Sequence, residues 1–291
     1  MTSQDSVDVR STFKECMTCS RTYCHLINQY FDRNDEAVEK ACDPLAGGMM
    51  NQGHQCGMIW GATLAAGAKA IELEDERDKS IARAVMLSEC IVESFEYTAG
   101  SSRCRDIIDI DLGKSTGLLK FIVKTSIQGS KKNPCFQLAE EWYPEVIETI
   151  EICIDEKTDF RPGVETCTAR LMYLTGGTIE EEIMTSGWGG GIALNGSACG
   201  ALAAAIWKVT KEWCERHPGK NPPYFSNRPA KRLLKAFKRV TGGKLTCREV
   251  CGRKFNDLAD HDQFVKAGGC EAILDVLAEI VNKEMKILNR N

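Results

Sequence analysis

A glycine-rich segment that ends in Cys-Gly occurs twice in this chain, and no other feature of the sequence constrains the fold as strongly. The first copy is AGGMMNQGHQCG at residues 46–57, and the second is GGGIALNGSACG at residues 189–200. Four glycines and the cysteine coincide at an offset of 143 residues. A run of small apolar residues follows each copy, at 62–70 and at 201–206. A match of this length indicates an internal duplication.

The same offset relates further residues outside the two glycine-rich segments. Three cysteines in each half coincide, and the last of them is followed in both halves by arginine and an acidic residue. The matched pairs are Cys24 with Cys167, Cys56 with Cys199, Cys104 with Cys247, and Arg105 with Arg248. A fourth cysteine follows less regularly in each half, at Cys135 and at Cys270. We interpret the chain as a tandem duplication, with a first helical repeat at 1–148 and a second at 149–291.

Each predicted repeat is long enough for a hydrophobic core of its own. The chain has 291 residues, of which 43% are hydrophobic and 27% are charged, as in an ordinary globular protein. Alternating strand patterns are scarce, whereas helix signals recur along the whole chain. We therefore predict an all-α fold in which two helical repeats pack about a pseudo-twofold axis.

Capping residues and prolines mark where the predicted helices begin and end. Asp35, Thr178 and Thr246 are expected N-caps, and glutamate three residues after each threonine completes a capping box. Pro44 disfavours helix at the residue before it. The predicted helices lie at 13–30, 35–42, 55–72, 75–97, 199–215 and 228–240, with further helices that carry Cys104, Cys135 and Cys247.

The order of these motifs resembles a known family. An early cysteine, Gly-Gly-Gly, Cys-Gly-Ala before a small-residue helix, Cys-Arg and a last cysteine are typical of the redox-active proteins written C-GCAxxG-C-C, a group that includes the split-Soret cytochrome c. The second copy is the closer match, because the first has Ala46 and Met58 where the second has Gly189 and Ala201. The resemblance implies an all-helical fold and a redox role, with an iron–sulfur cluster as the expected prosthetic group. Haem is not expected, since Ser20 follows the Cys-x-x-Cys segment at 16–19 where haem attachment needs histidine.

The paired cysteines are the candidate ligands of such clusters. A [2Fe–2S] or [4Fe–4S] centre is usually held by four cysteine thiolates. The candidates are Cys24, Cys56, Cys104 and Cys135 for one site, and Cys167, Cys199, Cys247 and Cys270 for the other. Cys251 lies one helical turn after Cys247 and is an alternative to Cys270. Cys16 and Cys19 could clamp a metal or form a redox pair, although one turn of helix also explains their spacing.

The residues beside these cysteines are suited to stabilising a thiolate. Cys56 and Cys199 are expected in the first turn of a helix, where free N–H groups and the positive end of the dipole favour negative charge. The upstream glycines allow backbone N–H groups to approach cluster sulfurs, and a basic residue could offset part of the cluster's charge. These supporting residues are Gly48, Gly53, Gly191, Gly196, Arg105 and Arg248.

The cysteine content leaves other functions open. Fifteen cysteines in a reducing compartment indicate metal, cluster or thiol chemistry rather than structural disulfides. The alternatives to a cluster protein are a metal-free thiol–disulfide redox or sensor protein and a zinc-binding structural module. The cysteines without a counterpart at the offset are expected to be small buried core residues; they are Cys42, Cys90, Cys153 and Cys214.

Charge and hydropathy limit the expected partners. A net charge of −4 provides no basic surface for nucleic acid or for an anionic membrane. The N-terminal residues lack the pattern of a signal peptide, and no apolar run approaches the roughly 20 residues that span a bilayer. We expect a cytoplasmic protein that exchanges electrons with a redox partner protein through one cluster per repeat, with a homodimer as a further option. A missing ligand, or a second centre built with Cys16 and Cys19, would allow catalysis on a small molecule, so enzymatic activity is left open.

Overall fold

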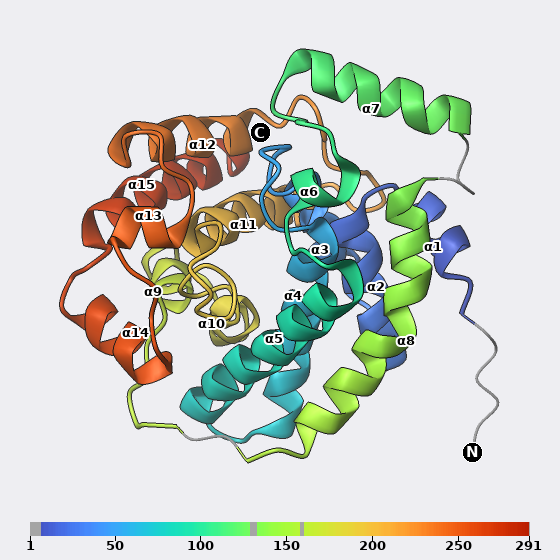
Figure 1. Cartoon of the computed structure of the whole chain (residues 1–291). Coiled ribbons are helices and arrows are strands. Elements are labelled where there is room, and N and C mark those ends of the chain that lie inside the picture. Colours follow the sequence, from blue (N-terminus) through green and yellow to red (C-terminus); the bar gives the residue numbers. More distant parts are fainter. Residues whose placement is uncertain (1–6, 129–132, 158–159, 291) are drawn as a thin grey trace.

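The described part of the chain is predominantly helical, as the sequence predicts (Figure 1). The structure is a computed structural model that describes residues 7–128, 133–157 and 160–290. These ranges form fifteen α-helices and one 3-10 helix and contain no β-strand, which confirms the all-α fold. The helices are α1 (Val9–Cys16), α2 (Cys19–Tyr30), α3 (Glu36–Ala41), η1 (Asp43–Leu45), α4 (Gly57–Leu73), α5 (Arg77–Ala99), α6 (Cys104–Ile108), α7 (Ser115–Gln128), α8 (Pro134–Ile154), α9 (Cys167–Leu174), α10 (Ile179–Ser186), α11 (Gly200–Arg216), α12 (Arg228–Val240), α13 (Cys247–Cys251), α14 (Leu258–Lys266) and α15 (Glu271–Leu288).

Several predicted helix boundaries are confirmed, because capping acts locally. The Asp35 side chain accepts a hydrogen bond from the backbone N–H of Val38 at the start of α3. Complete capping boxes are present at Thr178 and Thr246, which begin α10 and α13. α12 covers the predicted residues 228–240.

The predicted single helix at 13–30 is wrong. α1 ends at Cys16, Met17 takes a left-handed conformation with φ 68°, and Thr18 caps a new helix by accepting from the backbone N–H of Arg21. Cys16 and Cys19 therefore lie on two different helices rather than on one turn of the same helix. α7, α9, α14 and α15 are absent from the predicted set, and Figure 1 shows α7 on the outside of the molecule next to α6.

Each glycine-rich segment forms the same left-handed turn. Three consecutive non-glycine residues have positive φ in both copies, with 63°, 53° and 60° at residues 49–51 and 55°, 49° and 57° at residues 192–194. A left-handed helical conformation costs about 1–2 kcal/mol per L-residue, and it is rarest for a β-branched residue such as Ile192. The turn hydrogen bonds also coincide, since Met50 N donates to Pro44 O and Ala193 N to Gly187 O, both at 2.8 Å. The backbone of the first segment is thus repeated closely in the second.

The two halves of the chain interlock. α3 of the first half packs on α11 of the second, and α10 of the second half packs on α4 and α5 of the first. Trp60 and Trp188 meet edge to face at 5.4 Å between ring centroids, and Trp188 Nε1 donates to Thr63 Oγ1 at 2.9 Å. The largest group of buried apolar side chains consequently includes residues of both halves. The predicted division at 148/149 stays a prediction; α8 runs continuously across that position.

A disulfide joins two neighbouring helices of the first half. Cys90 of α5 is bonded to Cys153 of α8, and these helices pack against each other. The predicted burial is confirmed for Cys153, whereas Cys90 is only partly buried. The bond between them contradicts the expectation that the cysteines of this chain form no structural disulfides. The other two cysteines of that group, Cys42 and Cys214, are buried and free, as the sequence predicts.

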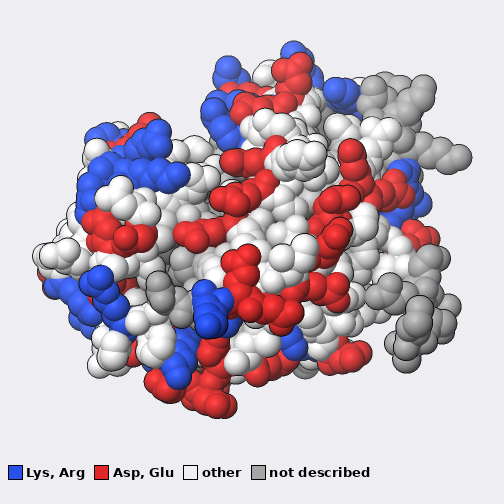
Figure 2. Space-filling model, turned by 60° about the horizontal axis from the view of Figure 1, so that its bottom comes forward, with Lys and Arg blue, Asp and Glu red and all other residues white. Residues whose placement is uncertain are grey.

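Charged side chains are distributed unevenly over the surface. Figure 2 shows a broad band of Asp and Glu across one face, with Lys and Arg gathered mainly toward one side. Within the sequence of α12, six residues are Lys or Arg and none is acidic. Among the helices of the described ranges, none combines the length and the apolar composition required to cross a membrane.

Candidate functional site

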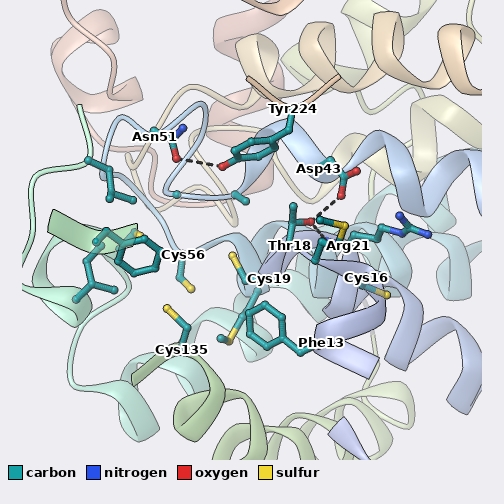
Figure 3. A pocket seen from close by; sticks show the side chains of 18 of the residues that line it. Phe13, Cys16, Thr18, Cys19, Arg21, Asp43, Asn51, Cys56, Cys135 and Tyr224 are labelled. Atoms are coloured by element: carbon teal, nitrogen blue, oxygen red, sulfur yellow. Dashed lines mark hydrogen bonds between the residues drawn. The ribbon is translucent and has the colours of Figure 1, made fainter. Parts of the chain in front are cut away.

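Four cysteines of the first half meet at one wall of a cavity. Cys19, Cys56, Cys104 and Cys135 all line a cavity of about 490 Å³. Figure 3 shows the sulfurs of Cys19, Cys56 and Cys135 pointing toward one another from separate elements of the chain. Their charges influence one another as well, because negative charge on Cys19 and Cys135 contributes to raising the pKa of Cys104. The fold thus brings together thiols that are up to 116 residues apart.

The close approach of two helices holds Cys19 beside Cys56. α2 packs on α4, and two glycines of α4 face the first turn of α2. A Cβ atom at Gly61 would overlap the carbonyl oxygen of Ser20, and one at Gly57 would overlap the Cys19 sulfur. The small residues after the glycine-rich segment are therefore needed for the contact between the two cysteines.

Backbone pairing places Cys104 next to the same segment. Gln55 and Arg103 form an isolated antiparallel bridge, and Cys104 N donates to His54 O at 2.7 Å. The second half has the same arrangement, with a bridge between residues 198 and 246 and a hydrogen bond of 2.6 Å from Cys247 N to the carbonyl of residue 197. In both halves this pairing places the Cys-Arg motif beside the glycine-rich segment.

Electrostatics at the first site favour negative charge on Cys19. Its pKa is lowered, chiefly because the Cys56 S–H donates to it, and also because the backbone N–H groups of Gly47, Ser20 and Gly57 point at its sulfur. Donation to Cys19, together with burial, raises the pKa of Cys56 well above its usual range. Burial also raises the pKa of Cys135 to about 12. The backbone around Cys19 is therefore arranged to hold a thiolate.

Cys24, the predicted first-site cysteine, lies elsewhere. It is in the interior of α2, fully buried, and its sulfur is hydrogen-bonded with that of Cys42, which raises the pKa of Cys24. Asn28 Nδ2 also donates to the Cys24 sulfur at 3.8 Å. The structure instead places Cys19, which the sequence analysis includes as an additional candidate, with Cys56. Cys16 lines the same cavity, and burial raises its pKa to about 11.

The counterpart of Cys167 is therefore Cys19 rather than Cys24. Thr18 caps α2 and Thr166 caps α9, so that Cys19 and Cys167 are each the first residue of a helix. Thr18 Oγ1 donates to Asp43 Oδ1 at 2.7 Å, and Thr166 Oγ1 contacts Ser186 Oγ at 3.2 Å. The offset between Cys19 and Cys167 is 148, so the first half is five residues longer between this cysteine and the glycine-rich segment. The shared Thr-Cys pair is the signal that could have identified Cys19.

Five cysteines form the corresponding cluster of thiols in the second half. Cys251 Sγ lies 3.7 Å from Cys247 Sγ and 3.9 Å from Cys270 Sγ. Cys167 is near Cys199, whose negative charge contributes to raising the Cys167 pKa to about 12 after the larger effect of burial. The predicted set of Cys167, Cys199, Cys247 and Cys270 is brought together here, and its predicted alternative Cys251 lies among them.

Cys251, the extra cysteine of the second site, has the thiol that is best placed to carry negative charge. S–H donation from Cys247 and then from Cys270 lowers the pKa of Cys251 to about 4, against the opposing effect of its burial. The same contacts raise the pKa of both donors well above the ordinary range. Burial lowers the pKa of the neighbouring His261 to about 4, so this imidazole is neutral at pH 7.

The two sites contain nine cysteines. All of them except Cys251 lie at helix N-termini. Four are the first residue of a helix, three are N-caps and one is the second residue. In chain order they are Cys19 of α2, Cys56 before α4, Cys104 of α6, Cys135 of α8, Cys167 of α9, Cys199 before α11, Cys247 of α13 and Cys270 before α15. Helix N-termini present free backbone N–H groups that stabilise thiolates.

The four predicted glycines have left-handed backbone conformations. Their predicted role at the sulfurs stays a prediction, and the glycine N–H groups that point at a cysteine sulfur are those of Gly47 and Gly57 at Cys19 and of Gly190 at Cys167. Gly48 and Gly191 have φ of 72° and 84°, and a Cβ at either position would overlap the backbone of the residue six positions later. Gly53 and Gly196 also have positive φ, with a Cβ at either position falling 3.0–3.2 Å from the nearest atom of the following arginine, Arg105 or Arg248. These contacts close the turn around the cysteines.

The arginines lie beside the turns rather than at the sulfurs. Arg105 Nη2 donates to Asp111 Oδ1 at 3.2 Å and to the backbone carbonyl of Gln52 at 3.4 Å. Its charge is thus partly neutralised by a carboxylate. The side chain of Arg248 packs against Gly196. Their predicted role in offsetting cluster charge stays a prediction.

Within residues 7–128, 133–157 and 160–290, no three Cys, His, Asp or Glu side chains are arranged to hold a single metal ion. A single ion needs its ligands to converge on one point at bonding distance. The thiolates of an iron–sulfur centre are instead bonded to different iron atoms and lie around its outside. The four thiols of the first site line one cavity of about 490 Å³ from separate helices, and such a set is compatible with ligands of the second kind.

A known protein family matches the first half of the chain. The family described as "Putative redox-active protein (C_GCAxxG_C_C)" matches residues 17–149, which include all four cysteines of the first site. The match lies on the first copy, whereas the sequence resemblance is closer in the second. No curated protein and no solved structure matches the chain.

Proposed function

Residues 17–149 belong to the C_GCAxxG_C_C family of redox-active proteins, and from this premise we propose that the chain is an electron-transfer protein with one iron–sulfur cluster in each cysteine site. The observation that carries the proposal is the convergence of four helix N-termini, each bearing a cysteine, on the cavity of the first site. A thiolate set of this kind has the composition that [2Fe–2S] and [4Fe–4S] centres require.

The proposed ligands differ between the sites. Cys19, Cys56, Cys104 and Cys135 would hold the first cluster. Cys167, Cys199 and Cys247 would hold the second, with Cys270 or Cys251 as its fourth ligand. Both assignments follow the local duplication of the glycine-rich turn and its pairing with the Cys-Arg helix, and they treat the second half as a second copy of the first.

When bound, such a cluster takes up and releases one electron. The chain would tune this chemistry through its backbone. The N–H groups of Gly47, Ser20 and Gly57 donate toward the Cys19 sulfur and stabilise negative charge on it. Cys56 and Cys104 are buried, whereas Cys19 and Cys135 are partly exposed. Hydrogen bonds to sulfur raise a cluster's potential.

The two sites are close enough in the fold to be connected directly. Gln55 precedes the cysteine of the first segment, and its Oε1 accepts from the backbone N–H of Ala198, which precedes the cysteine of the second, at 2.9 Å. We propose that electrons pass between the two clusters across this contact. The basic helix α12 is the proposed docking element for an acidic redox partner, because Lys238 Nζ donates to Gln52 Oε1 in the first segment at 2.6 Å.

The experiment is a measurement of iron, zinc and acid-labile sulfide per chain, with a visible spectrum, on anaerobically purified protein. Iron and sulfide in matching amounts with broad visible absorption support the proposal, and roughly four or eight irons per chain distinguish [2Fe–2S] from [4Fe–4S] at two sites. Zinc without sulfide would reject it in favour of a structural zinc module.

A second candidate is a thiol–disulfide redox protein. The two sulfur contacts of Cys251, at 3.7 and 3.9 Å, favour this alternative, because a low-pKa thiolate lies next to two possible partners. It predicts protein without metal whose mass falls by two protons for each pair oxidised. The same metal measurement separates the two functions.

A further inference from the structure

The cavity at the first site extends well beyond the four thiols. Its volume of about 490 Å³ is within the range of about 300–1,000 Å³ typical of small-molecule sites. Most of its wall is apolar, and the aromatic or aliphatic side chains on it include Phe13, Met58, Ile107, Ile108, Leu112 and Leu118. Met17, which is 74% exposed, also lines it, so the cavity reaches the surface.

Segments far apart in the chain close this cavity. Asn221, Pro222, Tyr224 and Phe225 of the second half form part of the wall. Tyr224 Oη donates to Asn51 Oδ1 at 3.1 Å, which ties this loop to the first glycine-rich segment, as Figure 3 shows. The second site thus supplies no part of the cavity, while the loop after α11 does.

One end of the cavity is polar and holds two ionisable side chains, the guanidinium of Arg21 and the carboxyl of Asp43. Arg21 lines it, and its Nη1 donates to Asn221 Oδ1 at 2.9 Å. The Nε of Arg21 is buried and has no hydrogen-bond partner among the described residues. Figure 3 places Arg21, Thr18 and Asp43 together on one side of the thiols. The nearby Asp43 is engaged by Thr18, which donates to it at 2.7 Å.

A buried N–H of a guanidinium without a partner costs free energy, and an anionic group in the cavity would remove that cost. A carboxylate suits a single guanidinium because its two oxygens match the planar arrangement of the N–H donors. The apolar wall suits a hydrocarbon or aromatic body attached to it.

We infer that the cavity is a binding site for a small organic carboxylate with an apolar body, whose carboxylate is held by Arg21 and whose body lies along the apolar wall beside the thiols. This goes beyond electron transfer, because it gives the first site a ligand of its own. It uses Arg21 and the apolar wall rather than the cysteines, and it therefore does not require either cluster.

The test is calorimetric titration of the full chain with 2-naphthoate and with its neutral analogue 2-naphthamide, with iron and sulfide measured in every sample. We expect the acid to bind about tenfold more tightly than the amide. Arg21→Met should weaken binding of the acid by about tenfold and remove the preference for it. Leu118→Trp, which fills the cavity from α7, should weaken binding of both compounds.

The matched control is Arg216→Met, because Arg216 also donates to an asparagine side chain but lies at the end of α11. It should leave both affinities unchanged. Any one of three results would overturn the inference. They are equal affinity for the acid and the amide, a loss of binding in the Arg216 variant as large as in the Arg21 variant, and no binding of the acid at about 1 mM. If protein without iron and sulfide binds the acid, the result supports the carboxylate site and counts against the clusters. If protein with iron and sulfide does not bind the acid, the result supports the clusters and overturns the carboxylate site.

Discussion

The two cysteine sites share a backbone and differ in what surrounds it. Both have the left-handed turn, the paired Cys-Arg helix and a threonine-capped cysteine. In the first, four thiols line a cavity of about 490 Å³ that is also walled by apolar side chains. In the second, a fifth cysteine lies within 3.7 and 3.9 Å of two of the others. The repeated turn therefore supports two sites of different character.

The difference shows which features of a site the shared turn determines and which it does not. The turn and the helix N-termini set where the sulfurs lie, because they are made by local backbone hydrogen bonds. The wall around the sulfurs comes from α6, α7 and the 221–225 loop at the first site and from α13 at the second. A ligand pocket can thus exist in one half without a counterpart in the other.

The largest expected effect separates Cys19 from Cys24 at the first site. Cys19→Ser removes a proposed ligand and should lower iron and sulfide per chain by about half. Cys24→Ser is the matched control from the same helix, and because Cys24 faces Cys42, it should keep its iron. The measurement is iron and sulfide analysis of both variants. A loss in the Cys24 variant with full iron in the Cys19 variant would restore the original pairing of Cys24 with Cys167.

The second site should keep its iron after the loss of one cysteine, whereas the first site should not. Because Cys251 touches both Cys247 and Cys270, either Cys251 or Cys270 can supply the fourth thiolate. Cys270→Ser and Cys251→Ser should each retain most of the second-site iron, and the double variant should lose about half of the chain's total. The measurement is iron per chain in these three variants, compared with the first-site variant Cys135→Ser, which has no spare cysteine. A loss of about half in one of the two single variants would identify the required ligand and refute the redundancy.

The left-handed turns should be equally sensitive to an added methyl group. Gly48→Ala and Gly191→Ala each place a Cβ at positive φ against backbone atoms. Each should lower the free energy of unfolding by about 2–3 kcal/mol. Chemical denaturation monitored by circular dichroism measures this. Gly100→Ala is the control, since its φ is also positive, at 70°, but open space surrounds it. A much smaller loss of unfolding free energy in one glycine-rich segment than in the other would show that the two turns are not equivalent.

A buried carboxyl should distinguish the halves by its pH dependence. Burial raises the pKa of Asp43 to about 6, whereas Ser186, at the same contact in the second half, does not titrate. Since the folded-state pKa is above the unfolded value of about 3.9, folding stability should fall as pH rises from about 4 to 6. Asp43→Asn should remove that fall and stabilise the chain by about 1–3 kcal/mol at pH 7.

Denaturation of the wild type and the Asp43→Asn variant between pH 4 and 7 measures the effect, with Asp35→Asn, at an exposed helix cap, as the control. Parallel stability curves for the wild type and the Asp43 variant would contradict the raised pKa.

The fold class and many helix starts could be predicted because they depend on local chemistry. Asp35, Thr178 and Thr246 cap helices through bonds to residues three positions away. The left-handed turn at 192–194 could not be predicted, since Ile, Ala and Leu all disfavour it and only the surrounding structure imposes it. A fixed offset of 143 residues pairs Cys24 with Cys167, because the first half is five residues longer between Cys19 and the glycine-rich segment than the second half is at the corresponding place. The disulfide between Cys90 and Cys153 depends on the packing of α5 on α8, which no local pattern encodes.

The central claim is that the chain holds two separate clusters, one in each cysteine site. The measurement that tests it most directly is iron and sulfide per chain in Cys56→Ser and in Cys199→Ser, compared with the wild type. Two separate sites predict that each variant retains about half of the iron and sulfide, with a visible spectrum of about half the intensity. Loss of all iron in either single variant would contradict the account, because it would mean that both cysteines belong to one shared centre.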